Sequence, residues 1–142
     1  MRFENDDPSH RKALIRALDS AGFNASEFNS GGGVMHVMMP LIDPYSDNGI
    51  SSVENPETAK KTADYLKKCK EEASLYIATS SAASNCDIGF IGDDGYGNQV
   101  ESPLWEHAGT LDDAVNIFLK LWQDRDYWLH EFLEGKLSQM SN

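Results

Sequence analysis

The stretch Val34-Met35-His36-Val37-Met38-Met39-Pro40-Leu41-Ile42 is almost continuously apolar and hardly alternates between apolar and polar side chains. A strand that is covered on both faces has this pattern, so we predict that the stretch lies centrally in a sheet. Pro40 has no backbone N–H to donate, and we therefore expect regular pairing to end there. The preceding stretch, Phe23–Asn29, is joined to it by the glycine-rich Ser30–Gly33, and the two stretches together predict a hairpin.

The residues before this hairpin predict a helix. Asp7 can cap it, Pro8 suits its first turn, and Gly22 can end it in a left-handed conformation. Leucines and alanines recur at helical spacing, which should leave three basic residues toward solvent: Arg11, Lys12 and Arg16. A second helix is expected to start at Asn55-Pro56-Glu57 and to bury a stripe formed by Ala59, Ala63, Leu66 and Cys69.

The second half of the chain predicts three further strands, at Leu75–Thr79, Cys86–Ile91 and Asn98–Glu101. Thr110 with Asp113 approximates a capping box before a third helix, whose apolar face would be Leu111, Val115, Phe118 and Trp122. A last helix follows and ends at Gly135. The order α-β-β-α-β-β-β-α-α predicts an α+β fold, with a mostly antiparallel sheet of about four to five strands packed with about three to four helices.

At 142 residues the chain suits one compact domain, which we expect to span residues 1–136 with a frayed tail at 137–142. No stretch approaches the roughly 20 apolar residues that a membrane helix needs, and the N-terminus lacks the apolar core of a signal peptide. A cytoplasmic protein is therefore expected. In that compartment Cys69 and Cys86 should be ordinary, partly buried thiols.

Charge is segregated along the chain. No lysine or arginine occurs between Arg16 and Lys60 or between Lys70 and Lys120, yet these two gaps hold fifteen of the 23 acidic residues. The basic residues fall on predicted helices or on the N-terminal lead-in, so the hairpins and their turns should form the acidic region. With a net charge of −11, such a surface attracts basic proteins and repels nucleic acid and anionic membranes.

Two acidic loops are candidate sites. The loop Asp43–Glu54 matches a calcium loop only in part, because Tyr stands at its third position and its glycine comes one place late. An ordinary surface loop is the simpler interpretation. The stretch Asp93-Asp94-Gly95-Tyr96-Gly97-Asn98 is typical of a hairpin turn. As a contact loop, it would present Tyr96 as contact surface and its two aspartates as negative charge to a basic partner.

Signals of catalysis are weak, and the sequence favours a non-enzymatic role with no catalytic residue, metal or cofactor. The four histidines show no i, i+3 or i, i+4 pair, and His36 in an apolar strand is expected to be a hydrogen-bonded core residue. The serines after Leu75–Thr79 lack a nucleophile elbow. One alternative stays open: a small metal-dependent or ligand-binding, enzyme-like domain that uses His36, His107 and the acidic loops.

The charge pattern favours an acidic protein-binding module that engages a basic protein. An inhibitor of a nucleic-acid-binding protein, such as a nucleic-acid mimic or phage anti-defence protein, would have this surface, as would an immunity protein. Acidity for solubility alone is a second interpretation. A structural protein that forms a homodimer through the region of Trp128 and Phe132 is a third. The expected partner contacts are Asp43, Asp47, Glu54, Asp87, Asp93, Asp94, Tyr96, Glu101, Trp105, Glu106, Asp112 and Asp113.

Overall fold

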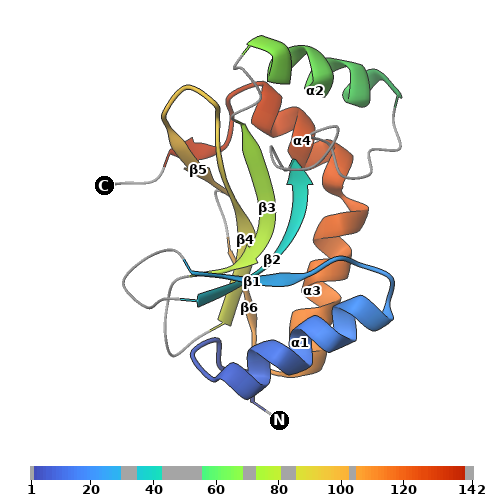
Figure 1. Ribbon diagram of the computed structural model, residues 1–142, viewed down its shortest axis with the longest axis vertical. Helices are drawn as coiled ribbons and strands as arrows, with labels where there is room; N and C mark the ends of the chain where they lie inside the picture. Colours follow the sequence, from blue (N-terminus) through green and yellow to red (C-terminus); the bar gives the residue numbers. More distant parts are fainter. Residues whose placement is uncertain are drawn as a thin grey trace. The chain divides into compact units, whose positions relative to one another are not determined.

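The computed structural model describes residues 2–29, 35–42, 56–68, 73–80, 86–102 and 105–139, and its elements follow one another as drawn in Figure 1. The helices and the mostly antiparallel strand pairs of these residues confirm the predicted α+β class. In chain order the elements are α1 (Pro8–Ser20), β1 (Ser26–Asn29), β2 (Met35–Ile42), α2 (Pro56–Lys68), β3 (Ser74–Thr79), β4 (Cys86–Asp93), β5 (Gln99–Glu101), β6 (Glu106–Ala108), α3 (Leu111–Gln123), α4 (Arg125–Leu133) and β7 (Ser138–Gln139).

The sheet has the strand order β1-β2-β3-β4-β5-β7, and β6 pairs with β4 outside this path. Strand β2 lies between β1 and β3 with most of its residues buried, which confirms its predicted central position. The prediction that regular pairing ends at Pro40 holds for the ladder with β1, but β2 itself continues to Ile42. The two strands are antiparallel, so the first residue of β1, Ser26, lies opposite Met38. No residue of β1 therefore needs a hydrogen bond from Pro40, which has no backbone N–H.

The residues group into two compact units, each built from three separate stretches of chain. Strands β2, β3 and β4 each begin in one unit and end in the other. Unit 1 comprises Met1–Met39, Ile77–Gly89 and Leu104–Leu121, and unit 2 comprises Pro40–Tyr76, Phe90–Pro103 and Trp122–Asn142.

In unit 1, α1 has the predicted ends. The Asp7 carboxylate accepts a hydrogen bond from the backbone N–H of Ser9 at 2.9 Å, and Gly22 follows the helix with φ 90°. The predicted exposure of Arg11 is wrong: only 7% of it is exposed. Arg11 precedes the buried Leu14 and Leu18 by three and seven positions, which puts it on the inward face of the helix.

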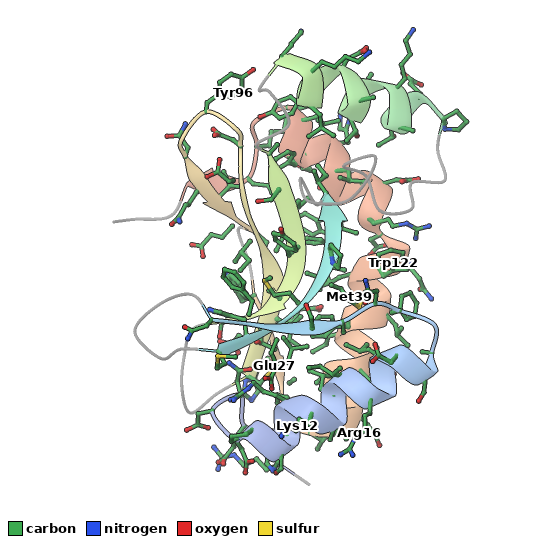
Figure 2. The ribbon with its side chains drawn as sticks, viewed as in Figure 1. Lys12, Arg16, Glu27, Met39, Tyr96 and Trp122 are labelled. Atoms are coloured by element: carbon green, nitrogen blue, oxygen red, sulfur yellow. The ribbon has the colours of Figure 1, made fainter. Side chains whose placement is uncertain are left out.

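The buried Arg11 has its charge paired. Its Nη1 donates to the backbone oxygen of Asn5, and its Nε donates to Glu27 Oε1 at 3.3 Å. The stem of the side chain is therefore covered while the guanidinium keeps an acceptor and a counter-charge, as burial of a charged group requires. By contrast, Lys12 and Arg16 are exposed as predicted (Figure 2).

The capping box before α3 is confirmed. The N–H of Asp113 donates to Thr110 Oγ1 at 3.1 Å, and the N–H of Thr110 donates to Asp113 Oδ2 at 3.2 Å. The buried residues of α3 are Ala114, Phe118 and Leu121, so of the predicted face only Phe118 is fully buried. Strand β6 was not expected from the sequence; it pairs antiparallel with β4.

In unit 2, α2 packs against α4. Helix α2 buries Thr62 and Leu66, whereas Ala59 and Ala63 are half-buried; Cys69 lies outside the described residues. Helix α4 starts after Asp124 and is followed by Gly135 with φ 71°, as predicted. Beyond it, two residues of the stretch expected to be a tail form β7, which pairs antiparallel with β5.

Candidate functional site

The loop between β4 and β5 in unit 2 is built around the carboxylate of Asp94. Asp94 Oδ1 accepts the backbone N–H groups of Tyr96 at 2.8 Å and Asn98 at 3.1 Å, and Oδ2 accepts Asn98 Nδ2 at 2.9 Å. Asp93 Oδ1 accepts the N–H of Gly95 at 2.8 Å. Gly95 and Gly97 have φ of 84° and 91°, a conformation that side chains disfavour. The predicted hairpin turn is thus confirmed, and its backbone is fixed by its own acids.

These hydrogen bonds keep Asp94 charged. Partial burial acts to raise the pKa of Asp94, but the donors on Asn98 and Tyr96 outweigh it, so the pKa lies below the ordinary value of 3.8. The loop therefore carries a permanent negative charge at neutral pH.

Tyr96 stands at the tip of this loop (Figure 2), and 60% of it is exposed. Its ring packs edge-on against Tyr65 of α2, with ring centroids 6.1 Å apart. Tyr65 in turn donates its hydroxyl hydrogen to the backbone oxygen of Asp94 at 2.5 Å and packs against Phe132 of α4 at 5.6 Å. The exposed ring of Tyr96 therefore packs against Tyr65, which is itself in contact with Phe132 and hydrogen-bonded to the loop.

A cavity of about 260 Å³ lies beside the loop in unit 2. Tyr65 and Phe132 contribute aromatic walls, Val100 and Leu137 add apolar surface, and Asp94 and Glu134 bring acidic residues to the lining. Of these residues, only Asp94 was among the predicted contacts. The others come from α2, β5, α4 and the residues that follow α4, and sequence alone does not show that such distant segments converge.

Four of the predicted contact residues lie together in unit 2. Asp93, Asp94 and Tyr96 share the loop region, and Glu101 follows on β5, opposite Ile91 of β4. Three others, Asp43, Asp47 and Glu54, lie outside the described residues. The partial calcium loop and its alternatives therefore stay predictions.

Most of the predicted contact residues of unit 1 make hydrogen bonds or ion pairs within the protein. Asp87 pairs with His107 at 3.1 Å across the β4–β6 ladder, and Glu106 accepts from Lys120 Nζ at 2.8 Å. Asp113 belongs to the capping box, and Trp105 is half-buried. Within the described ranges, Asp112 is an exposed acid of this group that makes no ion pair.

Of the two histidines considered for a site, His36 is a core residue and His107 is not. His36 is 4% exposed, and its Nδ1 lies 2.7 Å from the backbone oxygen of Thr79, which confirms a hydrogen-bonded core histidine. His107 is exposed and pairs with Asp87. Among the residues that the structure describes, no three His, Cys, Asp or Glu side chains are grouped to hold a metal ion. Burial, with a smaller contribution from the Asp87 charge, raises the pKa of Cys86 to about 12, so this thiol is unreactive at neutral pH.

The aromatic residues of the C-terminal region range from buried to exposed. Phe132 is 4% exposed, and the half-buried Trp128 packs against Phe90 with ring centroids 5.0 Å apart. Tyr127 is the exposed aromatic residue of α4, at 59%. Homodimer formation through the region of Trp128 and Phe132 stays a prediction.

Comparison of the chain with protein-family models, curated proteins and solved structures returns no match. In the described ranges, no helix is both long and apolar enough to cross a membrane.

Proposed function

We propose that this protein is a non-enzymatic, acidic binding module that inhibits a basic protein, either as a nucleic-acid mimic of the anti-defence type or as an immunity protein. The observation that supports it best is Tyr96, which is 60% exposed on a loop fixed by Asp93 and Asp94. Tyrosine is enriched at the centres of interfaces, and a loop that is already ordered loses little conformational entropy on binding.

Charge supplies the second part of the proposal. The net charge of −11 attracts a basic partner over distances comparable with the Debye length, about 8 Å at physiological salt. Asp93 and Asp94 lie in the same loop region as Tyr96, and Glu101 adds a further negative charge on the strand that follows. Such a surface would steer a basic protein toward the loop in the cytoplasm, and the association rate would fall as salt rises.

The test starts with capture of partners by the immobilised full chain at low and high salt, followed by purification of each captured protein. Affinity is then measured by calorimetry for the wild type, Tyr96→Ala and the matched control Tyr127→Ala. The two tyrosines are exposed to almost the same degree, 60% and 59%, so the variants remove similar exposed side chains. We expect Tyr96→Ala to weaken binding at least about tenfold, and Tyr127→Ala to change it little.

Two results would overturn the proposal. One is that no basic protein binds the purified chain in a salt-dependent way. The other is that Tyr96→Ala and Tyr127→Ala have equal effects on the affinity, since the loop would then not be the contact surface. Thermal unfolding of both variants checks that the fold is retained; loss of one edge-to-face ring pair costs only about 1 kcal/mol.

A further inference from the structure

We infer that the cavity beside the Asp93–Asn98 loop receives an arginine side chain from the basic partner. This assignment rests on the proposed function and names the chemistry that the surface would recognise. It is supported by the size of the cavity, by its aromatic walls, and by three sources of negative charge. These sources are Asp94, Glu134 and the C-terminal end of α4.

The size of the cavity fits a single side chain. At about 260 Å³ it is smaller than the roughly 300–1,000 Å³ of pockets that hold drug-sized molecules. Interface anchors commonly fill small pockets of this kind near the centre of a contact surface. Tyr96 does not line the cavity, but it packs against Tyr65, which does.

The walls suit a planar cation. The rings of Tyr65 and Phe132 line the cavity and are in edge-to-face contact, with centroids 5.6 Å apart and planes at 63°, so a guanidinium group would stack on one of the rings rather than between them. A guanidinium group stacks on such rings and also binds them through cation–π attraction, whereas an ammonium group is more strongly hydrated. Apolar surface from Val100 and Leu137 would cover the methylene stem.

The electrostatics of the cavity favour a positive charge. Asp94 and Glu134 are both lining residues, and the Asp94 carboxylate, which accepts hydrogen bonds from Tyr96 and Asn98, adds its negative charge near the cavity rather than a free acceptor. Helix α4 ends at Leu133, which also lines the cavity, so the negative end of the helix dipole faces this region. The nearby Lys136 does not cancel these charges, because its Nζ pairs with Glu131 at 3.8 Å.

The test uses the full chain and blocked amino acids as probes. The amide resonances of Glu134 and Gly135 are followed by NMR during titration with N-acetyl-arginine amide, its lysine counterpart and the uncharged citrulline analogue. We expect saturable shifts with arginine, weaker binding of lysine and no saturation with citrulline. Glu134→Gln should raise the Kd for the arginine probe about three- to tenfold. The control Asp6→Asn makes the same change in net charge at an exposed position of unit 1 that is not among the expected contacts, and it should leave the Kd unchanged.

The outcomes separate this assignment from the proposed function. Equal binding of citrulline, or equal effects of Glu134→Gln and Asp6→Asn, would overturn the arginine site. If Tyr96→Ala still weakened a salt-dependent complex in that case, the proposed function would survive without the cavity. If the arginine probe binds as expected while no basic protein binds the chain, the proposed function fails and the cavity is a cation site only.

Discussion

Asp94 and Asn98 are joined by three hydrogen bonds that close the loop between β4 and β5. The N–H of Asp94 donates to the backbone oxygen of Asn98 at 3.0 Å, while the backbone and side-chain nitrogens of Asn98 donate to the Asp94 carboxylate at 3.1 and 2.9 Å. The residue pair therefore fixes both ends of the segment that displays Tyr96.

This pair predicts a pH dependence of the loop. The pKa of Asp94 in the folded protein lies below 3.8, so the carboxylate stabilises the loop above that pH, and the contribution is lost as the pH falls through the folded pKa. In a carbon-detected NMR titration we expect a pKa below 3.8 for wild-type Asp94. Asn98→Ala removes one donor and should raise that pKa. A wild-type value at or above 3.8 would contradict the hydrogen-bond geometry.

Arg11 should be far more important for stability than its position on a surface helix suggests. Arg11→Ala removes the covered stem and two charge-assisted hydrogen bonds, to Asn5 and Glu27, and leaves the Asn5 carbonyl without its donor. We expect the free energy of unfolding in urea to fall by about 2–4 kcal/mol. The exposed Arg16→Ala on the same helix should change it by less than about 0.5 kcal/mol. Equal effects would show that the Arg11 contacts contribute nothing.

The capping box gives a smaller and local prediction. Thr110→Ala removes the oxygen that accepts the N–H of Asp113, and we expect a loss of about 1 kcal/mol in the free energy of unfolding. The neighbouring Asp112→Asn removes a charge but no hydrogen bond of the capping box, so its loss in the free energy of unfolding should be clearly smaller. Amide exchange in the first turn of α3 should accelerate in Thr110→Ala. Unchanged exchange there would count against the cap.

Gly92 marks a close approach of strands β3 and β4. A Cβ at this position would lie 2.1 Å from the backbone oxygen of Ser74, and backbone cannot move aside as a flexible side chain can. We expect Gly92→Ala to cost about 2–3 kcal/mol, measured by urea unfolding. The matched control is Gly109→Ala, whose Cβ would meet only the Asp113 carboxylate at 3.4 Å. A Gly92→Ala protein as stable as this control would mean that the strands separate at no cost.

The sequence predicts those parts of the fold that local chemistry decides. Asp7, Thr110 and Gly135 set helix ends through hydrogen bonds and backbone conformation within a few residues, so these ends were predicted correctly. Strands β6 and β7 are only three and two residues long, and they exist because β4 and β5 offer open backbone groups. No pattern of their own identifies such short strands.

In the candidate site, too, the local features were predicted and the long-range contact was not. The aspartates and glycines of the β4–β5 loop predicted a turn that displays Tyr96, and the structure has that turn. The contact between Tyr96 and Tyr65 was not predicted, because Tyr65 lies 31 positions earlier in the chain and only packing brings the two rings together. Arg11 could have been found: its spacing from Leu14 and Leu18 is that of an inward residue, although its charge suggested solvent.

The interleaving of the two units limits how this protein can be shortened or made. Since each unit takes its residues from three separate stretches, any cut that removes one end of the chain takes material from at least one unit and leaves no intact unit as a continuous fragment. During synthesis, β2 emerges from the ribosome well before β3, its neighbour on the second side. The edge of β2 that later pairs with β3 stays open during this interval, and unpaired strand edges are prone to aggregation.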